Sequence, residues 1–336
     1  MTAAPIPASW AGPARRVAGI AVSVAFLALT ISRVDLAGAA DAIARVAPVG
    51  IAVALALAAL EVVIRAERWR RLLTPFAPVR LPTAFAYLCI GYFANTLLPA
   101  RLGDVARAVL AARAFGIPRL RTLGTILLER IADGVLILTV TAAFALALPE
   151  ARPLLETARL VAIVGAIGVL GLAVTLLVTH RSRVATTRGG GVVRTVLARL
   201  GEGLTGARTP VGFAVFVGLS VLAFAVAVAA LFAIATALGV GLTVPQATLV
   251  MGALALSTAI PAAPGSIGTY EFVGLTTLTG IGVAPEPAIA LVILVHLIAT
   301  VPPALAGLTM TAVLHLNVFA TSGTAEPGPQ GVPAGR

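Results

Sequence analysis

The sequence predicts an all-α, polytopic integral membrane protein with about six full transmembrane helices and two re-entrant hairpins in an inverted repeat. The first reason is composition: 59% of the 336 residues are hydrophobic and only 11% are charged, whereas soluble domains average roughly 25% charged residues. The second is that no charged side chain lies between Arg208 and Glu271. The third is that prolines and glycines interrupt this neutral stretch. Backbone that leaves the helix at membrane depth must lie within protein or line a wet cavity.

Six apolar segments have about the 20 residues that a spanning helix needs, namely 15–32, 48–64, 122–148, 154–178, 210–238 and 286–316. The run after Arg15-Arg16 resembles a signal peptide, but the next segment is again membrane-like, so we expect a retained first helix. We expect a single transmembrane domain over 15–316, an N-terminal tail over 1–14 and a disordered tail over 317–336, which is rich in Pro and Gly.

Basic loops decide the predicted topology. Segments 65–80, 101–121 and 180–208 each carry five or six arginines against one acidic residue, and such loops face the cytoplasm. All three do so only if 82–115 enters the membrane and returns on the same side. By the same reasoning, segment 247–284 enters the membrane from the outside and returns to the outside. We therefore expect a multi-pass plasma-membrane protein with both termini in the cytoplasm; eight full crossings are the alternative.

This topology makes the two halves of the chain similar. Residues 15–148 are predicted as helix, helix, hairpin, helix from the inside, and residues 154–316 repeat that order from the outside. Inverted repeats of this kind occur in transporters whose central sites are built from broken helices.

The tip of the first hairpin carries the first candidate site. Pro99 disfavours helix and Gly103 permits a tight bend. Arg101, Asp104 and Arg107, at three-residue spacing, share one helical face with net positive charge. Since arginine forks bind phosphate bidentately, we expect a lipid-phosphate site here; the alternative is a basic turn that touches headgroups nonspecifically. The site residues are Asn95, Pro99, Arg101, Gly103, Asp104 and Arg107.

Charged residues inside the spans form the second candidate site. Asp133 lies about 16 Å from the start of its helix, where each charge costs roughly 2.5–3.5 kcal/mol. Glu129 and Asp133 share a face, and Arg130 can pair with Asp133. They line a translocation path or relay protons, or else form a structural ion pair that locks the helix to the first hairpin. His296, in the last helix, is a proton relay or a hydrogen-bonded structural residue.

The break in the neutral stretch is the third candidate site. Its residues are Pro261, Pro264, Gly265, Gly268 and Glu271. The free N–H groups at a helix start near Gly268 suit an anion, while Glu271 either caps that start or pairs with an arginine of the first hairpin. The alternative is an ordinary extracellular loop between two helices.

Other functional classes are disfavoured. The net charge of +11 is expected to orient the chain in the membrane rather than bind nucleic acid. The single cysteine, Cys89, excludes an internal disulfide and a cysteine metal cluster. No nucleophile elbow, phosphate-cradling loop or metal-ligand spacing is present, so we expect no cofactor or metal, and a transporter more than an enzyme. Arg68-Trp69-Arg70-Arg71 is interpreted as an interfacial anchor.

Together these motifs resemble the membrane region of lysylphosphatidylglycerol synthases, a family of flippase-like membrane proteins. The resemblance covers about 15–316, although Asp104 stands where Glu is more common. In full-length synthases this region moves an aminoacylated lipid between leaflets and precedes a soluble aminoacyl-transferase domain. The sequence ends after the membrane part, so the resemblance implies lipid binding or translocation without lysyl transfer from tRNA.

The resemblance leaves several alternatives open. The expected partners are membrane lipids, either a phospholipid or a polyprenyl-phosphate lipid, and a homo-oligomer is left open. A membrane-embedded transferase or accessory subunit that acts on polyprenyl-phosphate-linked sugars is the main alternative. A non-catalytic envelope interaction protein is the other. The headgroup, the direction and the energy source of transport do not follow from the resemblance.

Overall fold

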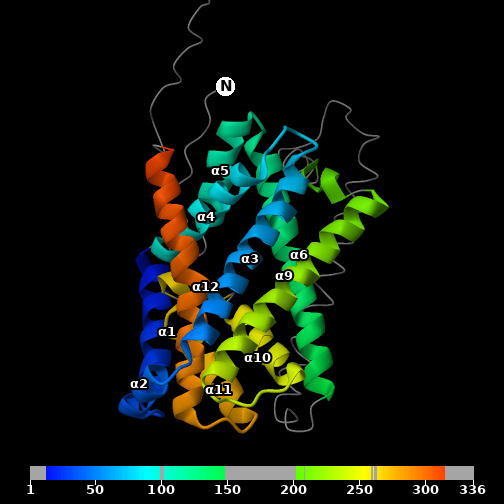
Figure 1. Cartoon of the computed structure of the whole chain (residues 1–336). Helices are drawn as coiled ribbons and strands as arrows, with labels where there is room; N and C mark the ends of the chain where they lie inside the picture. The colour runs from blue at the N-terminus through cyan, green and yellow to red at the C-terminus, as the bar shows by residue number, and fades with distance from the viewer. Residues whose placement is uncertain are drawn as a thin grey trace, which may run out of the picture.

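The computed structural model describes residues 13–98, 102–147, 202–207, 209–258, 260 and 263–314. All regular structure within these ranges is helical, which confirms the all-α prediction (Figure 1). The elements are α1 Pro13–Ile31, α2 Leu36–Ala44, α3 Pro48–Leu73, α4 Leu81–Leu97, α5 Leu102–Phe115, α6 Arg119–Ala147, η5 Gly203–Ala207, α9 Pro210–Ala237, α10 Val244–Ser257, η6 Pro264–Ser266, α11 Thr269–Gly280 and α12 Pro285–Val313.

Three of the described helices, α3, α9 and α12, are long and apolar enough to cross a membrane, and α1 with α2 adds a fourth if the bent pair is one span. Their exposed faces carry large apolar side chains such as Leu60 and Leu305, which suits contact with lipid. The chain is therefore a membrane protein, while the count of about six spans stays a prediction. The expected helix 154–178, the tail 317–336 and residues 1–12 lie outside the described residues.

Two helices differ from the sequence prediction. Helix α1 ends at Ile31, close to the predicted end at residue 32, but the chain then turns by 82° into the short helix α2, for which we had made no prediction. Asp35 caps α2 by accepting a hydrogen bond from the backbone N–H of Ala37, which explains why a new helix starts there. In addition, α3 does not end at residue 64 but continues through the basic segment to Leu73.

Antiparallel packing of α3 and α9 forms the centre of the molecule (Figure 1). At one end the N–H of Ala47 donates to the carbonyl of Ala237 over 3.2 Å. Farther along the pair, within both helices, Arg68 Nη1 donates to Ser220 Oγ over 2.8 Å. These two contacts fix the register of the two helices.

Two helical hairpins, α4–α5 and α10–α11, lie toward opposite ends of this central pair (Figure 1). Phe76, before α4, lies 5.7 Å from the guanidinium carbon of Arg121, after α5. Leu242, before α10, and Ile281, after α11, belong to one buried cluster. Each hairpin therefore starts and ends at the same end of the bundle. Helix α4 packs on α12, and α10 packs on α6.

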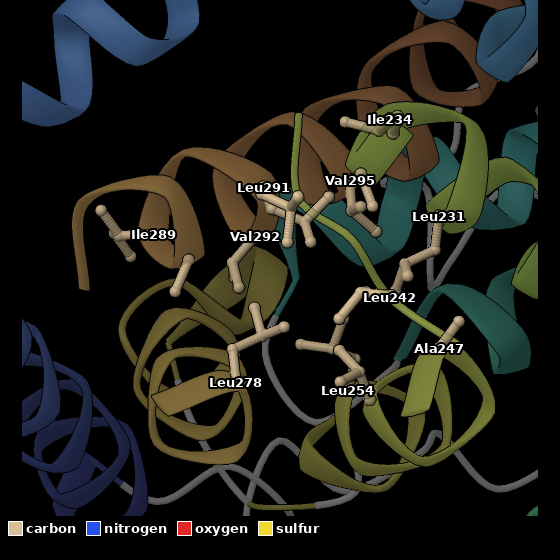
Figure 2. Close-up of a cluster of buried hydrophobic side chains, with 14 of the residues drawn as sticks. Leu231, Ile234, Leu242, Ala247, Leu254, Leu278, Ile289, Leu291, Val292 and Val295 are labelled. Carbon is tan, nitrogen blue, oxygen red and sulfur yellow. The ribbon is translucent and has the colours of Figure 1, made fainter. Parts of the chain in front are cut away.

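The largest buried apolar cluster holds the second hairpin against α9 and α12. Figure 2 shows Leu254 of α10 and Leu278 of α11 facing Leu291 and Val292 of α12. Leu231 of α9 closes the cluster on the other side. Inside a bilayer such contacts stabilise the fold through close packing more than through transfer from water.

The first hairpin depends on one close approach between its helices. A Cβ on Gly103 would lie 2.2 Å from the carbonyl oxygen of Gly91 and 2.6 Å from the backbone nitrogen of Asn95. No real Cβ tolerates such distances, so α5 passes against α4 only because residue 103 is glycine.

We predict that Gly103→Ala lowers the unfolding free energy by roughly 1–3 kcal/mol, the usual cost of overpacking. Gly218→Ala is the matched control, because a Cβ there meets nothing within 4 Å. The control should be neutral or stabilising by up to about 1 kcal/mol, since alanine favours helix. Titration with SDS in mixed micelles measures the unfolding free energy of both variants. Equal stability of the two variants would show that α4 and α5 do not approach this closely.

Candidate functional site

Charged side chains gather where α3, α5 and α6 meet. On α3, Glu61, Arg65 and Arg68 lie at i, i+4 and i+7 and so share one face. Helix α5 adds two charged residues and α6 adds three. The charge network comprises Glu61, Arg65, Arg68, Asp104, Arg107, Glu129, Arg130 and Asp133. Four arginines thus face four carboxylates, and the network is formally neutral.

Asp133 joins α6 to α3. Both terminal nitrogens of Arg68 donate to this carboxylate, with Nη2–Oδ2 at 3.1 Å. Arg65 Nη1 lies 3.3 Å from Oδ2, and Arg65 Nε donates to Glu61 over 2.7 Å. A bidentate guanidinium–carboxylate pair is the strongest geometry available to these groups, so Asp133 holds the two helices in register.

Glu129 lies at the centre of the network and is 1% exposed. Its two oxygens lie 3.4 Å from Arg68 Nε and 3.1 Å from Arg107 Nη2. Arg107 is completely buried, with its guanidinium carbon 4.4 Å from the centre of the Trp69 ring. The indole in turn donates to Thr125 Oγ1 over 3.1 Å. One carboxylate therefore forms ion pairs with arginines from two different helices.

Asp104 links the first hairpin to α6. Its Oδ2 lies 3.2 Å from Arg130 Nε and its Oδ1 lies 3.8 Å from Arg107 Nη2. The sequence spacing had allowed Arg130 to pair with Asp133 one turn along the same helix. Arg68 and Arg65 already bind Asp133, and Arg130 forms its ion pair across the helices instead.

The network keeps unused hydrogen-bonding capacity. Arg107 Nε and Nη1 are buried without a hydrogen-bond partner among the described residues, and so is Asn95 Oδ1. The side chains of Arg65 and Arg130 remain 22% and 31% exposed. Tyr92 of α4 lies within electrostatic range of Arg65, Arg107 and Arg130. The cluster is thus partly accessible at Arg65 and Arg130.

A cavity of about 420 Å³ lies beside the network, between the end of α3, η5 and the start of α9. Arginines line one side: Arg68, Arg70 and Arg71. The other side is mainly apolar and includes Val211, Val215, Phe216 and Leu219. Arg68 belongs both to this wall and to the network, so the cavity borders the network at that residue.

The predicted interfacial anchor is wrong for two of its four residues. Trp69 is fully buried and Arg68 is 2% exposed, whereas Arg71 remains exposed. The reason is the extension of α3: because the helix continues through this segment, alternate sides of it face the core and the surface. Arg70 and Arg71 both bind Glu67, with Arg71 Nε at 2.7 Å.

The second hairpin carries a separate polar cluster. Glu271 caps α11, because the N–H of Gly268 donates to its Oε2 over 2.6 Å. Its Oε1 lies 2.6 Å from His296 Nδ1, and His296 Nε2 lies 2.9 Å from the carbonyl oxygen of Gly265. The Tyr270 ring stacks on the imidazole. Of the two expected roles for Glu271, the cap is confirmed, and the Gly268 N–H that we had offered to an external anion is already used.

A family comparison agrees with these motifs. The model for the lysylphosphatidylglycerol synthase TM region matches residues 16–307. The chain belongs to this family. A search of curated proteins gave no match. Membership supports a membrane protein in lipid metabolism or transport.

The structure places most of the predicted residues of this lysylphosphatidylglycerol synthase region in two clusters. Pro99, Arg101 and Pro261 lie outside the described residues. Sequence reasoning missed Arg65 and Arg68 as site residues because we had counted segment 65–80 as a loop, and it gave Glu61, inside the predicted helix 48–64, no role. The spacing of Glu61, Arg65 and Arg68, which puts them on one helical face, is the sequence feature that would have identified them. Ser220, Tyr92 and Tyr270 gave no such signal, since they meet the clusters only through tertiary packing.

For this family member we predict that Glu129→Ala lowers stability by about 3–5 kcal/mol, because it leaves two buried arginines without their shared partner. Glu202→Ala is the control: it removes a salt bridge to Arg121 whose two side chains are 41% and 37% exposed, and such surface pairs contribute at most about 1 kcal/mol. Unfolding in SDS mixed micelles measures the loss of stability in the Glu129→Ala and Glu202→Ala variants. Similar losses would mean that Glu129 is not the centre of a buried network.

Proposed function

We propose that the protein binds a phosphate-bearing lipid and moves it between the leaflets of the plasma membrane. The observation that carries this proposal is the buried charge network between α3, α5 and α6. Each charge at mid-membrane costs roughly 2.5–3.5 kcal/mol. A bundle that only needed to fold would be served as well by apolar contacts. Retention of eight such groups at one place supports a site for a charged substrate.

Partner exchange is the proposed mode of phosphate binding. Arg107 offers two donors without a hydrogen-bond partner, and Arg65 and Arg130 are partly exposed. A phosphate oxygen resembles a carboxylate oxygen as an acceptor for guanidinium. The lipid phosphate would therefore take up the free donors first and then replace Asp104 or Glu61 on its arginine. Arg101, directly before α5, would make the first contact at the hairpin tip.

The 420 Å³ cavity between α3 and α9 supports entry from the side of the bundle. It combines arginines with an apolar wall, and a phospholipid combines an anionic headgroup with an acyl chain. Arg70 and Arg71 lie at the end of the bundle that carries the basic segments. We assign that end to the cytoplasm, together with both termini.

Packing supports the proposed inverted repeat. Helices α3 to α6 and α9 to α12 follow the same order, with 26, 17, 14 and 29 residues against 28, 14, 12 and 29. Each hairpin's first helix packs on the last helix of the other half, α4 on α12 and α10 on α6. In addition, η6 at the tip of the second hairpin contacts α4 of the first. Two hairpins that enter from opposite faces and meet suit an alternating-access site.

The transport assay follows from this proposal. In proteoliposomes, wild-type protein should move a labelled phospholipid between leaflets, read out by quenching from outside, with no new lipid species in mass spectrometry. Arg101→Ala should reduce the rate at least about tenfold, because a charged hydrogen bond to phosphate contributes roughly 1.5–3 kcal/mol. Circular dichroism and thermal unfolding should be unchanged.

Arg113→Ala is the matched control. Arg113 is an exposed arginine in the last turn of α5, so its removal changes net charge equally and should leave transport unaltered. Normal transport by the Arg101 variant would refute the phosphate role. A new covalent lipid in the wild-type reaction would instead favour a transferase.

Sidedness of the two hairpins is tested with introduced cysteines in a Cys89→Ala background. We expect Ala100→Cys and Pro264→Cys to react slowly with a membrane-impermeant reagent added to either side. Val49→Cys, at an exposed position in the first turn of α3, should react quickly from one side only. Fast labelling of the two hairpin positions from opposite sides would mean that they are ordinary loops and that the segments cross the membrane fully.

A further inference from the structure

The His296–Glu271 pair must hold a proton in this conformation. The carbonyl oxygen of Gly265 only accepts hydrogen bonds, so His296 Nε2, at 2.9 Å, carries a hydrogen. The 2.6 Å contact between Nδ1 and Glu271 Oε1 needs a second hydrogen. That hydrogen belongs to an imidazolium beside a carboxylate, or to a carboxylic acid beside a neutral imidazole. Both descriptions contain one proton more than a neutral histidine with an ionised glutamate, and both give a pair without net charge.

Loss of that proton breaks one of the two contacts. A neutral imidazole has a single N–H. If it stays on Nε2, the Nδ1 lone pair faces a carboxylate at 2.6 Å; if it moves to Nδ1, the Nε2 lone pair faces the Gly265 carbonyl. The site also gains a negative charge where His296 is only 9% exposed, which is unfavourable without a partner. Deprotonation therefore releases either Glu271 or the hairpin tip.

The tip that His296 holds has an unusual backbone. Gly265 and Gly268 have φ values of 72° and 90°, and Ser266, a non-glycine residue, has φ 58°. A non-glycine residue in this region needs support from its surroundings. Part of that support comes from α1, because Ser23 Oγ accepts from the N–H of Ala263 over 2.8 Å. A Cβ on Gly268 would lie 2.3 Å from the Ser23 carbonyl oxygen, so movement of the tip is transmitted to α1.

Few other ionisable groups lie near the His296–Glu271 pair. Tyr270 of α11 stacks on the imidazole at 4.2 Å between ring centres, and its phenol lies within electrostatic range of Glu61 on α3. Arg33, after α1, lies 5.7 Å from the ring of Phe272, the residue next to Glu271. Helices α9 and α10 contain no charged residue.

More distant groups leave the pair unaltered. Asp35 and Glu286 both lie beside Gly38 of α2, and Asp41 is on the same helix, which packs on α12. Glu286 is ten residues from His296, about 15 Å along the helix. Tyr92 of α4 lies near the charge network instead. Glu271 and His296 are therefore the two groups that exchange a proton here.

We infer that the His296–Glu271 pair is a proton-binding site that couples proton movement to movement of the lipid, an inference that rests on the proposed function. When protonated, the neutral pair holds the tip of the second hairpin against α1 and α4. When the proton leaves to water, the pair becomes a neutral histidine and a carboxylate, His296 loses its contact with either Glu271 or Gly265, and the second hairpin is held less firmly. One proton is released or bound in each transition between the two positions of the hairpin.

Glu271→Gln is the variant that isolates the proton. The glutamine amide donates to Nδ1 of a neutral His296, and its carbonyl oxygen accepts from Gly268, so every contact remains without an exchangeable proton. Glu286→Gln, which neutralises another carboxylate of the same region at the start of α12, is the matched control. Both variants should unfold at the wild-type temperature.

Hydrogen exchange tests the site without any transport. In nanodiscs, protection of residues 263–272, corrected for intrinsic exchange, should fall about tenfold as pH rises through a single midpoint in wild type and in Glu286→Gln, as expected for loss of a hydrogen bond to a charged group. Glu271→Gln should stay protected at every pH. Protection that does not change with pH in wild type would overturn the proton site.

Proteoliposomes that contain labelled phospholipid and an internal pH dye test the coupling. Wild type and Glu286→Gln should move protons with lipid and should change rate when a pH gradient is imposed, while Glu271→Gln should lose the proton flux. A wild-type rate of lipid movement that does not change with the pH gradient would overturn the coupling. Absence of any lipid movement would refute the proposed function, and the exchange titration would still decide whether the pair binds a proton.

Discussion

Charge balance inside an apolar bundle is the constraint on which this structure depends. Glu129 is almost completely buried and forms ion pairs with both Arg68 of α3 and Arg107 of α5. An unpaired charge at this depth costs several kcal/mol, whereas a paired one is tolerated. A shift of α6 by one residue along its axis would separate all of its carboxylates from their arginines. The ion pairs therefore set the relative position of three helices that apolar contacts alone would let slide.

Sequence reasoning found most of the fold because uniform apolarity is a strong signal. Helices α9 and α12 were predicted to within a few residues, since nothing in them competes with the membrane assignment. Helix α3 was predicted too short, because its C-terminal third is as basic as a loop. Composition could not distinguish arginines that face lipid headgroups from arginines that face buried carboxylates. Only the spacing of Glu61, Arg65 and Arg68 indicated that these arginines face the interior.

For the candidate sites, too, the sequence predicted some features and missed others. Spacing along one helix pointed to Glu129 with Asp133 and to Asp104 with Arg107, because neighbours at three and four residues share a side. It could not identify partners on other helices, and so the pair of Arg130 with Asp104 was missed. The cap at Glu271 was predictable, since a carboxylate three residues after a glycine at a helix start reaches back to the free N–H. Its second partner, His296, lies on another helix and follows only from tertiary packing.

The two hairpins differ in what their charges can do. Arginine keeps its proton in proteins, so the network of the first hairpin changes state only by exchanging one anion for another. Histidine beside a carboxylate can lose a proton, so the second hairpin changes state without any ligand. If a lipid phosphate enters a neutral chamber, the bundle gains a negative charge that it must compensate before the lipid crosses its centre. If the inferred coupling holds, a proton that binds to the deprotonated His296–Glu271 pair removes one negative charge from the other hairpin, whose tip contacts α4. An asymmetric pair of hairpins therefore suits a cycle in which one half selects the anion and the other balances it.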